Sequence, residues 1–288
     1  ITGKGRCNVT NNCDPDTLMR NIPRNSRFLY SAFHAFSPSD TMEFFESRGL
    51  PLKTERGNRV FPVSDRAADV AATLEDALKD PLITVKTGRA VSLLIENDCV
   101  TGVCCEDGTE YRASSTLLAT GGKSYPLTGS TGDGYAMAAA LGHTIVPPRG
   151  SLVPLESSDP DCAAMQGLSL RNVEATVLNG RNKPVFREFG EMLFTHFGVS
   201  GPLMLSASAH LRRWDKEQYR LVIDLKPALD EKKLDARILR DFQKYANRDF
   251  KNALYDLAGH AMIPVLVRLS GIPENTIQIL LRKAKIFI

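Results

Sequence analysis

The segment from Leu118 to Tyr135 constrains the fold of this chain more than any other part of it. It reads LATGGKSYPLTGSTGDGY, in which an apolar run stops at paired glycines and a second glycine-rich turn precedes strong helix formers. We therefore predict a strand, two turns and a helix. In that order, backbone N–H groups and the helix N-terminus can face an anionic group. The alternative is a tight connection in which glycine supplies only backbone freedom.

The composition is that of a soluble globular protein, long enough at 288 residues for more than one folded unit. The 36 Lys and Arg are interspersed with 33 Asp and Glu, so the net charge of +3 predicts no nucleic-acid partner. No apolar run is long enough to span a membrane, and no secretory signal is visible. The six cysteines form no CxxC pair and no regular framework, which predicts reduced thiols and a cytoplasmic location.

The first half of the chain alternates helical and β patterns. Apolar spacing predicts a helix over 28–36, and either Ser37 or Ser39 is placed to cap a second helix that ends near Gly49. A hairpin is predicted at 52–61, and Asp65 precedes an amphipathic helix. Further β segments, three of them forming an antiparallel meander, are predicted at 83–85, 90–96, 99–105, 110–113 and 115–119.

The composition changes at residues 147–150, where we place a boundary. Beyond it β patterns dominate as far as residue 225. Within them a short strand leads through a glycine-bearing turn, and Ser200 is predicted to cap the helix that follows. From Asp230 onward the pattern is helical, with helices predicted at 234–245, 251–257, 263–269 and 274–285.

The N-terminal residues 1–12 form a polar loop that contains glycines, two cations and three asparagines. Such a loop can wrap a phosphate or a polar ring with its backbone donors and with Arg6. A disordered terminus has a similar composition and is the alternative.

Four blocks of sequence, in family order, resemble the aminoacetone oxidase-like (YhiN-type) flavoproteins, a branch of the two-dinucleotide-binding-domain FAD oxidoreductases. The blocks are TGKGRCNVTN at 2–11, RVFP at 59–62, the glycine-rich segment at 119–134 and FTHFGVSGP at 194–202. The resemblance implies an α/β fold whose FAD-binding, Rossmann-like domain is of the glutathione-reductase type. The implied parts are an FAD-binding domain over 1–147, an inserted β-rich domain over 148–228 and a helical segment over 229–288.

The resemblance also implies which residues lie beside FAD. Val91 matches the position whose backbone meets the adenine, and Arg6 is expected to stabilise the reduced flavin by its charge. Asp133 has an alternative role as a simple helix cap. The implied cofactor-binding residues are Gly5, Arg6, Asn8, Thr10, Asn11, Val91, Ala119, Thr120, Gly121, Gly122, Ser124, Thr131, Gly132, Asp133 and Gly134.

Two segments of the resembled family have no counterpart here, namely the N-terminal GxGxxG turn and a C-terminal FAD segment. The chain starts at Ile1 without a methionine and ends on the apolar Ile288. We therefore expect an incomplete FAD-binding domain. The strand at 115–119 is then expected to leave part of its sheet with an unpaired edge.

The resemblance implies an FAD-dependent oxidoreductase that acts on a small organic substrate by hydride transfer to or from the flavin. Amine oxidases and NAD(P)H-linked reductases both fit, and NAD(P)H is the expected electron donor only for the second. Two alternatives stay open: a cofactor-free, truncated remnant acting as a binding module, and a flavin-dependent RNA-modifying protein. His196, in a turn, is the candidate catalytic residue, with a core or capping role as its alternative. No metal site is expected, and no pattern predicts the oligomeric state.

Overall fold

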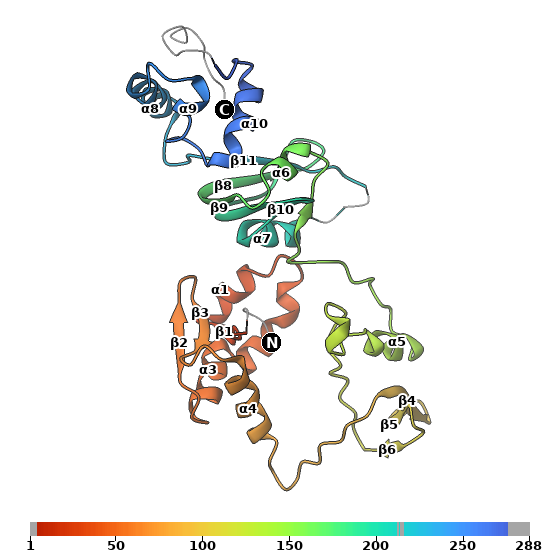
Figure 1. The fold of residues 1–288 in the computed structure, drawn as a ribbon. Coiled ribbons are helices and arrows are strands. Elements are labelled where there is room, and N and C mark those ends of the chain that lie inside the picture. The colour runs from red at the N-terminus through yellow and green to blue at the C-terminus, as the bar shows by residue number, and fades with distance from the viewer. Residues whose placement is uncertain (1–4, 212, 214–215, 276–288) are drawn as a thin grey trace. The chain divides into compact units, whose positions relative to one another are not determined.

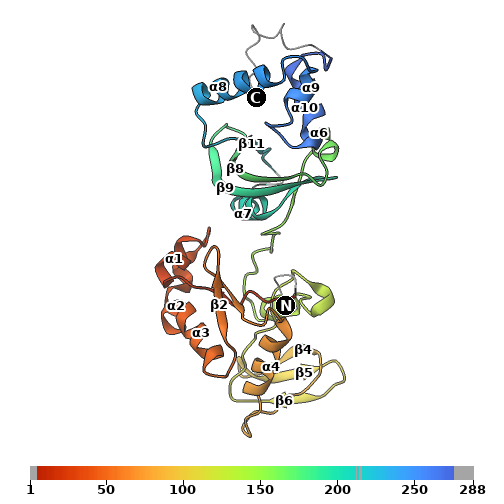
Figure 2. The ribbon, with the colours of Figure 1, turned by 60° about the vertical axis from the view of Figure 1, so that its left-hand side comes forward.

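The computed structural model describes residues 5–211, 213 and 216–275 of the chain. It divides into two compact units, residues 1–146 and 147–288 (Figures 1 and 2), which are described here one at a time. The limits predicted from the sequence for three parts, at residues 147 and 228, stay predictions.

Short helices occupy the first part of unit 1. They are α1 Pro15–Arg20, η1 Ser26–Leu29, α2 Tyr30–Ala35, α3 Pro38–Glu46 and α4 Ala67–Ala77. Of the two predicted caps, Ser37 is the one that begins α3: its Oγ accepts from Asp40 N at 3.2 Å, and Asp40 Oδ2 accepts from Ser37 N at 2.7 Å. This reciprocal pair is a capping box, which satisfies two backbone donors at the start of the helix. Phe45 of α3 and Val70 of α4 pack in one apolar cluster with Leu50.

A three-stranded antiparallel sheet lies beside these helices, and it contains the predicted hairpin. Its strands are β1 Thr10–Asn11, β2 Leu52–Glu55 and β3 Arg59–Pro62, in the order β1-β3-β2. The turn between β2 and β3 has positive φ at Gly57 and Asn58, 77° and 57°. Val60 is fully buried and Phe61 is 5% exposed, so β3 is the buried centre of the sheet.

The predicted meander is confirmed as a second antiparallel sheet of unit 1. Its strands are β4 Ala90–Glu96, β5 Cys99–Cys105 and β6 Glu110–Arg112, in sequence order. Asn97 and Asp98 connect β4 to β5 with φ of 49° and 61°. Both central turn residues are therefore left-handed, as a type I′ hairpin requires.

Two further strands predicted for unit 1 are wrong: residues 83–85 and 115–119 form no strand in the structure. A strand exists only where a neighbour accepts and donates its backbone hydrogen bonds, and no described strand pairs with either segment. The expected sheet edge at 115–119 is wrong for the same reason. Their apolar side chains face solvent instead, with Val85 67% exposed and Leu117 90% exposed.

Unit 2 is built on one five-stranded antiparallel sheet. Its strands are β7 Leu155–Glu156, β8 Ser169–Leu178, β9 Pro184–Thr195, β10 Gly198–Ser200 and β11 Arg220–Asp224. They lie in the order β11-β8-β9-β10-β7, so the long β8–β9 hairpin is at the centre. Inward-facing Val173, Ala175 and Val177 alternate along β8 and are at most 2% exposed. This period of two is the pattern of a strand with one buried face.

Helices cover both faces of this sheet (Figures 1 and 2). They are α6 Pro160–Ala164, α7 Pro202–His210, α8 Glu231–Lys244, α9 Phe250–Ala253, η3 His260–Met262 and α10 Ile263–Ser270. Met204 of α7 and Val265 of α10 belong to the same core cluster as the strands. The predicted helix at 274–285 lies almost entirely outside the described residues. No helix in the described ranges has the length and apolar character needed to cross a membrane.

The start of α7 differs from the prediction. Ser200 belongs to β10, and the residue that precedes α7 is Gly201, with φ of 91° and no side-chain cap. A Cβ at Gly201 would lie 2.9 Å from Met192 Cα. Glycine is therefore required here by both conformation and close packing of α7 on β9.

We predict that Leu203→Ala destabilises unit 2 by about 2–5 kcal/mol, because Leu203 of α7 is 2% exposed in the core. The matched control is Leu269→Ala in α10, where the side chain is 66% exposed and the expected change is within about 0.5 kcal/mol. Urea unfolding followed by circular dichroism measures both. Equal effects of the two substitutions would contradict the described core.

Candidate functional site

The N-terminal loop of unit 1 is tied to the β2–β3 hairpin by backbone and amide hydrogen bonds. Val9 N donates to Val60 O at 2.9 Å. With its amide oriented to satisfy both groups, Asn8 Nδ2 donates to the carbonyls of Thr10 and Val60 at 2.9 and 3.1 Å. Asn11 Nδ2 donates to Gly57 O at 2.9 Å. The amides predicted to face a cofactor thus hold the loop on the sheet.

Arg6 lies in a compact cluster of charges at the edge of this sheet. Its Nη2 donates to Glu55 Oε1 at 2.5 Å and its Nε donates to Asp65 Oδ1 at 2.7 Å. Lys53 Nζ pairs with Asp65 Oδ2 at 2.7 Å. The guanidinium also lies over the Phe61 ring, 4.2 Å from its centroid. Two cations and two carboxylates therefore neutralise one another.

The pKa values in this cluster shift as expected for close ion pairs. The hydrogen bond from Arg6 lowers the pKa of the Glu55 carboxyl, with smaller contributions from the nearby charges of Arg6 and Lys53. For Asp65 the hydrogen bond from Lys53 lowers the pKa most, followed by that from Arg6. Arg6 is thus already paired with carboxylates, and in this arrangement its charge is not directed at a ligand.

Val91 lies where the β4–β5 ladder changes register. The pairing passes from Ala90 opposite Cys105 to Ser92 opposite Cys104, so Val91 is the extra residue of a β-bulge. The extra residue of a bulge takes no part in the ladder. In the described β4–β5 ladder Val91 has no residue opposite it, which is compatible with the backbone contact implied for this position.

The glycine-rich segment leads into α5, Asp133–Ala140, by a close approach of two backbones. Gly121, Gly129 and Gly132 have φ of 74°, 91° and 86°, which other residues rarely adopt. A Cβ at Gly134 would overlap Thr120 Oγ1, so the first turn of α5 rests directly on the glycine turn. Glycine is therefore needed in this segment for two reasons: its backbone can adopt positive φ, and it has no Cβ to block the close approach at Gly134.

The N-terminus of α5 already faces a negative charge from the chain itself. Arg89 Nε donates to Asp133 Oδ2 at 3.2 Å, and this bond, with a smaller contribution from Thr131, lowers the pKa of the Asp133 carboxyl. An ionised Asp133 in the first turn satisfies the positive end of the helix dipole. Asp133 therefore already supplies a negative charge at this end of α5.

The structure brings some predicted residues together and leaves others apart. Arg89, next to β4, links the region of Val91 to Asp133. In the described residues no hydrogen bond or ion pair joins the loop around Arg6 to the glycine-rich segment. His196 belongs to unit 2, in the exposed turn between β9 and β10, where its ring meets Phe197 edge-on at 5.0 Å.

Sequence reasoning missed the partners of the predicted cations. Glu55 and Asp65 are 49 and 59 residues from Arg6, and Arg89 is 44 residues from Asp133. No periodicity in the sequence signals pairs that are so far apart along the chain. Among the described residues no group of three or more His, Cys, Asp or Glu is arranged to hold a metal ion.

Two profiles of one protein family match the chain. The profile described as HI0933-like protein Rossmann domain matches residues 1–207, and the profile described as HI0933-like protein barrel and H2TH domain matches residues 149–285. The first alone covers more than half of the chain. These matches confirm the expected α/β fold class, with a Rossmann-like domain and a β-rich and helical part.

Three curated proteins are similar to most of the chain. A 3-dehydro-bile acid delta(4,6)-reductase of Clostridium scindens is 29% identical over 276 residues, 95% of this chain and 66% of the relative. The ribosomal RNA dihydrouridine synthase of Escherichia coli is 27% identical over 280 residues, 96% of this chain and 66% of the relative. That of Haemophilus influenzae is 29% identical over 232 residues, 79% and 55% of the two chains. The chain thus spans less than two thirds of each relative.

We predict that Gly134→Ala weakens the packing of α5 on the glycine turn, because the new Cβ overlaps Thr120 Oγ1. A loss of about 1–3 kcal/mol is typical of overpacking. Thr120→Ala in the same chain removes the clash, since the remaining contact with Thr120 Cβ is an ordinary 3.5 Å. Urea unfolding of the single and double variants measures the rescue; a double variant no more stable than Gly134→Ala contradicts the contact.

We predict that unit 1 loses stability in acid through the Arg6 cluster. Because the folded-state pKa values of Glu55 and Asp65 are lowered, this stability is present above the unfolded values of 4.5 and 3.8 and is lost as pH falls below them. Arg6→Gln should flatten the fall of the urea midpoint between about pH 6 and pH 3. Arg56→Gln, at an exposed cation without an ion pair among the described residues, should leave the slope unchanged. A slope that Arg6→Gln leaves intact would argue against the cluster.

Proposed function

The chain belongs to the HI0933-like family, an FAD-binding Rossmann family, and on that premise we propose that it acts as an FAD-dependent reductase. The proposed substrate class is a carbon–carbon double bond conjugated with a carbonyl group. The observation that supports this class is the likeness over 95% of the chain to a protein named as a 3-dehydro-bile acid delta(4,6)-reductase.

The names of the relatives share one kind of chemistry. A 3-dehydro, delta(4,6) steroid carries two double bonds in conjugation with a ketone, and the relative named for it is a reductase. Dihydrouridine is uridine with hydrogen added across the ring double bond next to a carbonyl, and two relatives are named as its synthases. Both products arise by adding a hydride and a proton to an electron-poor double bond. The reductase alternative is therefore favoured over an amine oxidase.

Two parts of unit 1 are proposed to contact the cofactor: the bulge at Val91 and the glycine-rich segment. FAD, when bound, supplies the hydride-transfer chemistry, and the protein supplies orientation and electrostatics. The bulged backbone at Val91 offers a donor and an acceptor of the kind that an adenine edge needs. The left-handed glycines Gly121 and Gly132 leave backbone N–H groups without a side chain over them, beside Thr120 and Ser124. Asp133 stays paired with Arg89 and orders the turn.

NAD(P)H is the proposed electron donor, because a reductase must be resupplied with a hydride at each turnover. An amine oxidase would instead pass electrons from its substrate to oxygen. Anaerobic bleaching of the bound flavin by NADPH, and not by aminoacetone, is the expected result. Bleaching by the amine alone would overturn the reductase proposal.

The first test is the visible spectrum of the purified protein. A flavin band near roughly 450 nm that survives desalting is expected, because the cofactor carries the chemistry. The Gly132→Val variant puts a branched side chain at a φ of 86°, and a lower flavin content is expected for it. Gly142→Val is the matched control, since Gly142 also has a φ of 86° but lies beyond the end of α5. A colourless protein that does not take up added FAD would contradict the proposal.

A second candidate function is reduction of uridine in RNA. It is favoured by the two relatives named as ribosomal RNA dihydrouridine synthases, which are 27% and 29% identical to this chain. Reduced protein is mixed without oxygen with a 3-oxo-4,6-diene steroid or with uridine-containing RNA, and reoxidation of the flavin is followed. Reoxidation by the steroid alone supports the first candidate, and reoxidation by RNA supports the second.

A further inference from the structure

A basic pocket lies in unit 2, whereas the residues proposed to meet FAD belong to unit 1. It is a cavity of about 740 Å³ between the β8–β9 turn and the segment that precedes β11. The lining residues are Asn179, Gly180, Arg181, Lys183, Arg213, Lys216, Glu217 and Gln218. Four of the eight are cationic and one is anionic, whereas cations and anions are nearly balanced over the whole chain.

The β8–β9 turn is fixed by its own hydrogen bonds. Asn179 Oδ1 accepts from both Arg181 N and Lys183 N at 3.0 Å. Asn182 has a φ of 57°, and its backbone N donates to Asn179 O at 2.8 Å. The turn therefore presents Arg181 and Lys183 from a rigid loop, and less entropy is lost when they bind a ligand.

The second wall of the pocket packs against this turn. Glu217 Cγ lies 3.5 Å from where a Cβ of Gly180 would be, so the two segments are in contact. The backbone turns tightly there, with Lys216 N and Glu217 N donating to Arg213 O at 2.9 and 2.8 Å. Tyr219 OH donates to Glu217 Oε2 at 3.3 Å, which holds the one carboxylate of the pocket in place.

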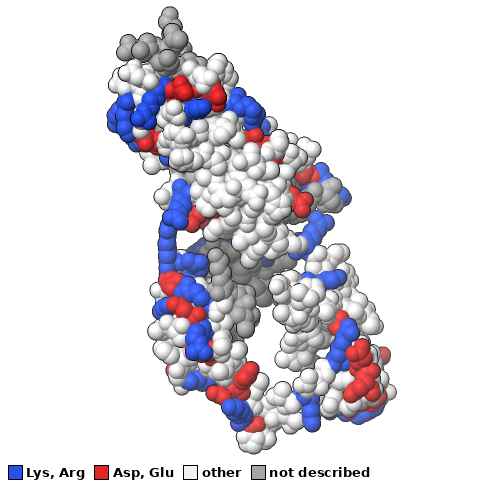
Figure 3. All heavy atoms as spheres, in the orientation of Figure 1, with Lys and Arg blue, Asp and Glu red and all other residues white. Residues whose placement is uncertain are grey.

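The four cations of the pocket form no ion pair with the residues that the structure describes. Within the described residues none of Arg181, Lys183, Arg213 and Lys216 has a carboxylate partner. Some other cations of unit 2 are paired, as Arg187 is with Glu174 and Lys244 with Asp256. Over the helices of unit 2, Figure 3 likewise shows blue and red side chains interspersed.

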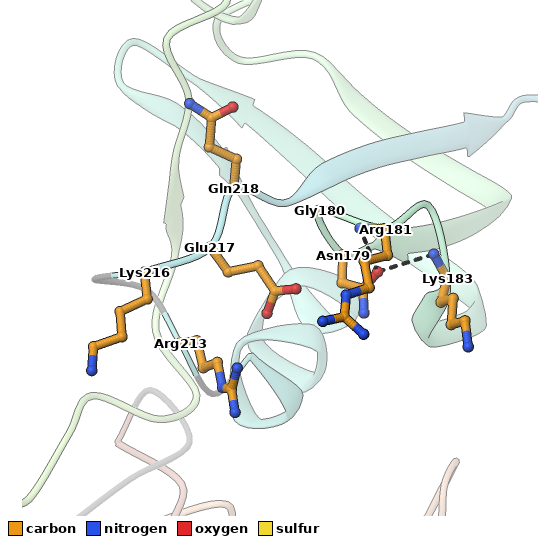
Figure 4. A pocket seen from close by; sticks show the side chains of 8 residues that line it. All are labelled: Asn179, Gly180, Arg181, Lys183, Arg213, Lys216, Glu217 and Gln218. Atoms are coloured by element: carbon orange, nitrogen blue, oxygen red, sulfur yellow. Dashed lines mark hydrogen bonds between the residues drawn. The ribbon is translucent and has the colours of Figure 1, made fainter.

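The side chains are arranged as one surface. In Figure 4 the four cationic side chains extend to the same side of the two segments, and Gln218 points the other way. Glu217 reaches between the cations from above them in this view. A row of cations on one side suits successive phosphates of an extended strand better than it suits a single small anion.

We propose that this basic pocket binds the phosphate backbone of RNA. The inference rests on the second candidate function, reduction of uridine in RNA, and would give that reaction a site in unit 2 that holds the substrate strand. Contacts of cations with phosphates carry no sequence information, so the pocket would position RNA rather than select a base. Release of counterions makes such binding depend steeply on salt.

The test measures binding of the whole chain to a fluorescein-labelled, uridine-containing single-stranded RNA of about 16 nucleotides, by anisotropy at several NaCl concentrations. The quadruple variant Arg181→Gln, Lys183→Gln, Arg213→Gln, Lys216→Gln removes the four cations. Each lost phosphate contact lowers the slope of log affinity against log salt by about 0.7 for a single strand, so a decrease of about 3 is expected. At low salt the affinity should fall at least about tenfold.

The matched control removes two exposed arginines and two exposed lysines of unit 1: Arg24→Gln, Arg27→Gln, Lys79→Gln and Lys86→Gln. It has the same net charge as the quadruple variant and should keep the affinity and the salt slope. If the quadruple variant does not fold, the pairs Arg181→Gln, Lys183→Gln and Arg213→Gln, Lys216→Gln should each give about half of the change.

Three results would overturn the inference: no binding of RNA by the unaltered chain, an equal loss in the control, or binding through these cations to phosphatidylglycerol vesicles but not to RNA. The assay uses no flavin chemistry. A protein that holds FAD but loses no RNA affinity in the quadruple variant therefore contradicts this inference alone. A colourless protein that binds RNA through the pocket contradicts the proposed reductase function alone.

Discussion

The backbone hydrogen bonds between β8 and β9 support the whole of unit 2. The two strands pair from Ser169 opposite Leu193 to Leu178 opposite Pro184, and every other strand of the sheet is added to this hairpin. Helices then pack on both of its faces, and the same core cluster contains residues of α7 and α10. The hairpin also fixes the turn at its tip, because the ladder that positions the core ends where Asn179 begins the basic pocket. The core of unit 2 and the position of the cations in the β8–β9 turn thus both depend on the backbone hydrogen bonds between β8 and β9.

Local signals in the sequence predicted the elements that make their own hydrogen bonds. Ser37 followed by Pro38 and Asp40 identified a helix start, and the structure has the full capping box. The hairpin at 52–61 and the meander from Ala90 were predicted because turn residues and alternation lie within a few positions of each other. The segments at 83–85 and 115–119 have equally apolar sequences, but a central strand also needs a neighbour, and apolar character alone does not supply one.

The sequence predicted which residues belong to the candidate site, but not which residues they contact. The quoted motifs led to the family, and the HI0933-like profiles confirm that resemblance. The charges around Arg6 could not be predicted, since its carboxylate partners are contributed from distant positions and depend on how the hairpin packs. The bulge at Val91 is also invisible in sequence, because a one-residue change of register leaves the apolar pattern of β4 almost unaltered. The basic pocket joins two segments that are about thirty residues apart, for which composition gave only a mild net charge.

The exposed apolar segments of unit 1 have a consequence for the behaviour of the protein in solution. Leu82, Val85 and Leu117 are 93%, 67% and 90% exposed, on stretches whose backbone is not paired with any described strand. Extended apolar chain outside a sheet is a template for intermolecular β-pairing. We therefore expect self-association to grow with protein concentration and to begin at these two stretches. A charged residue placed at either stretch would act as a gatekeeper against it.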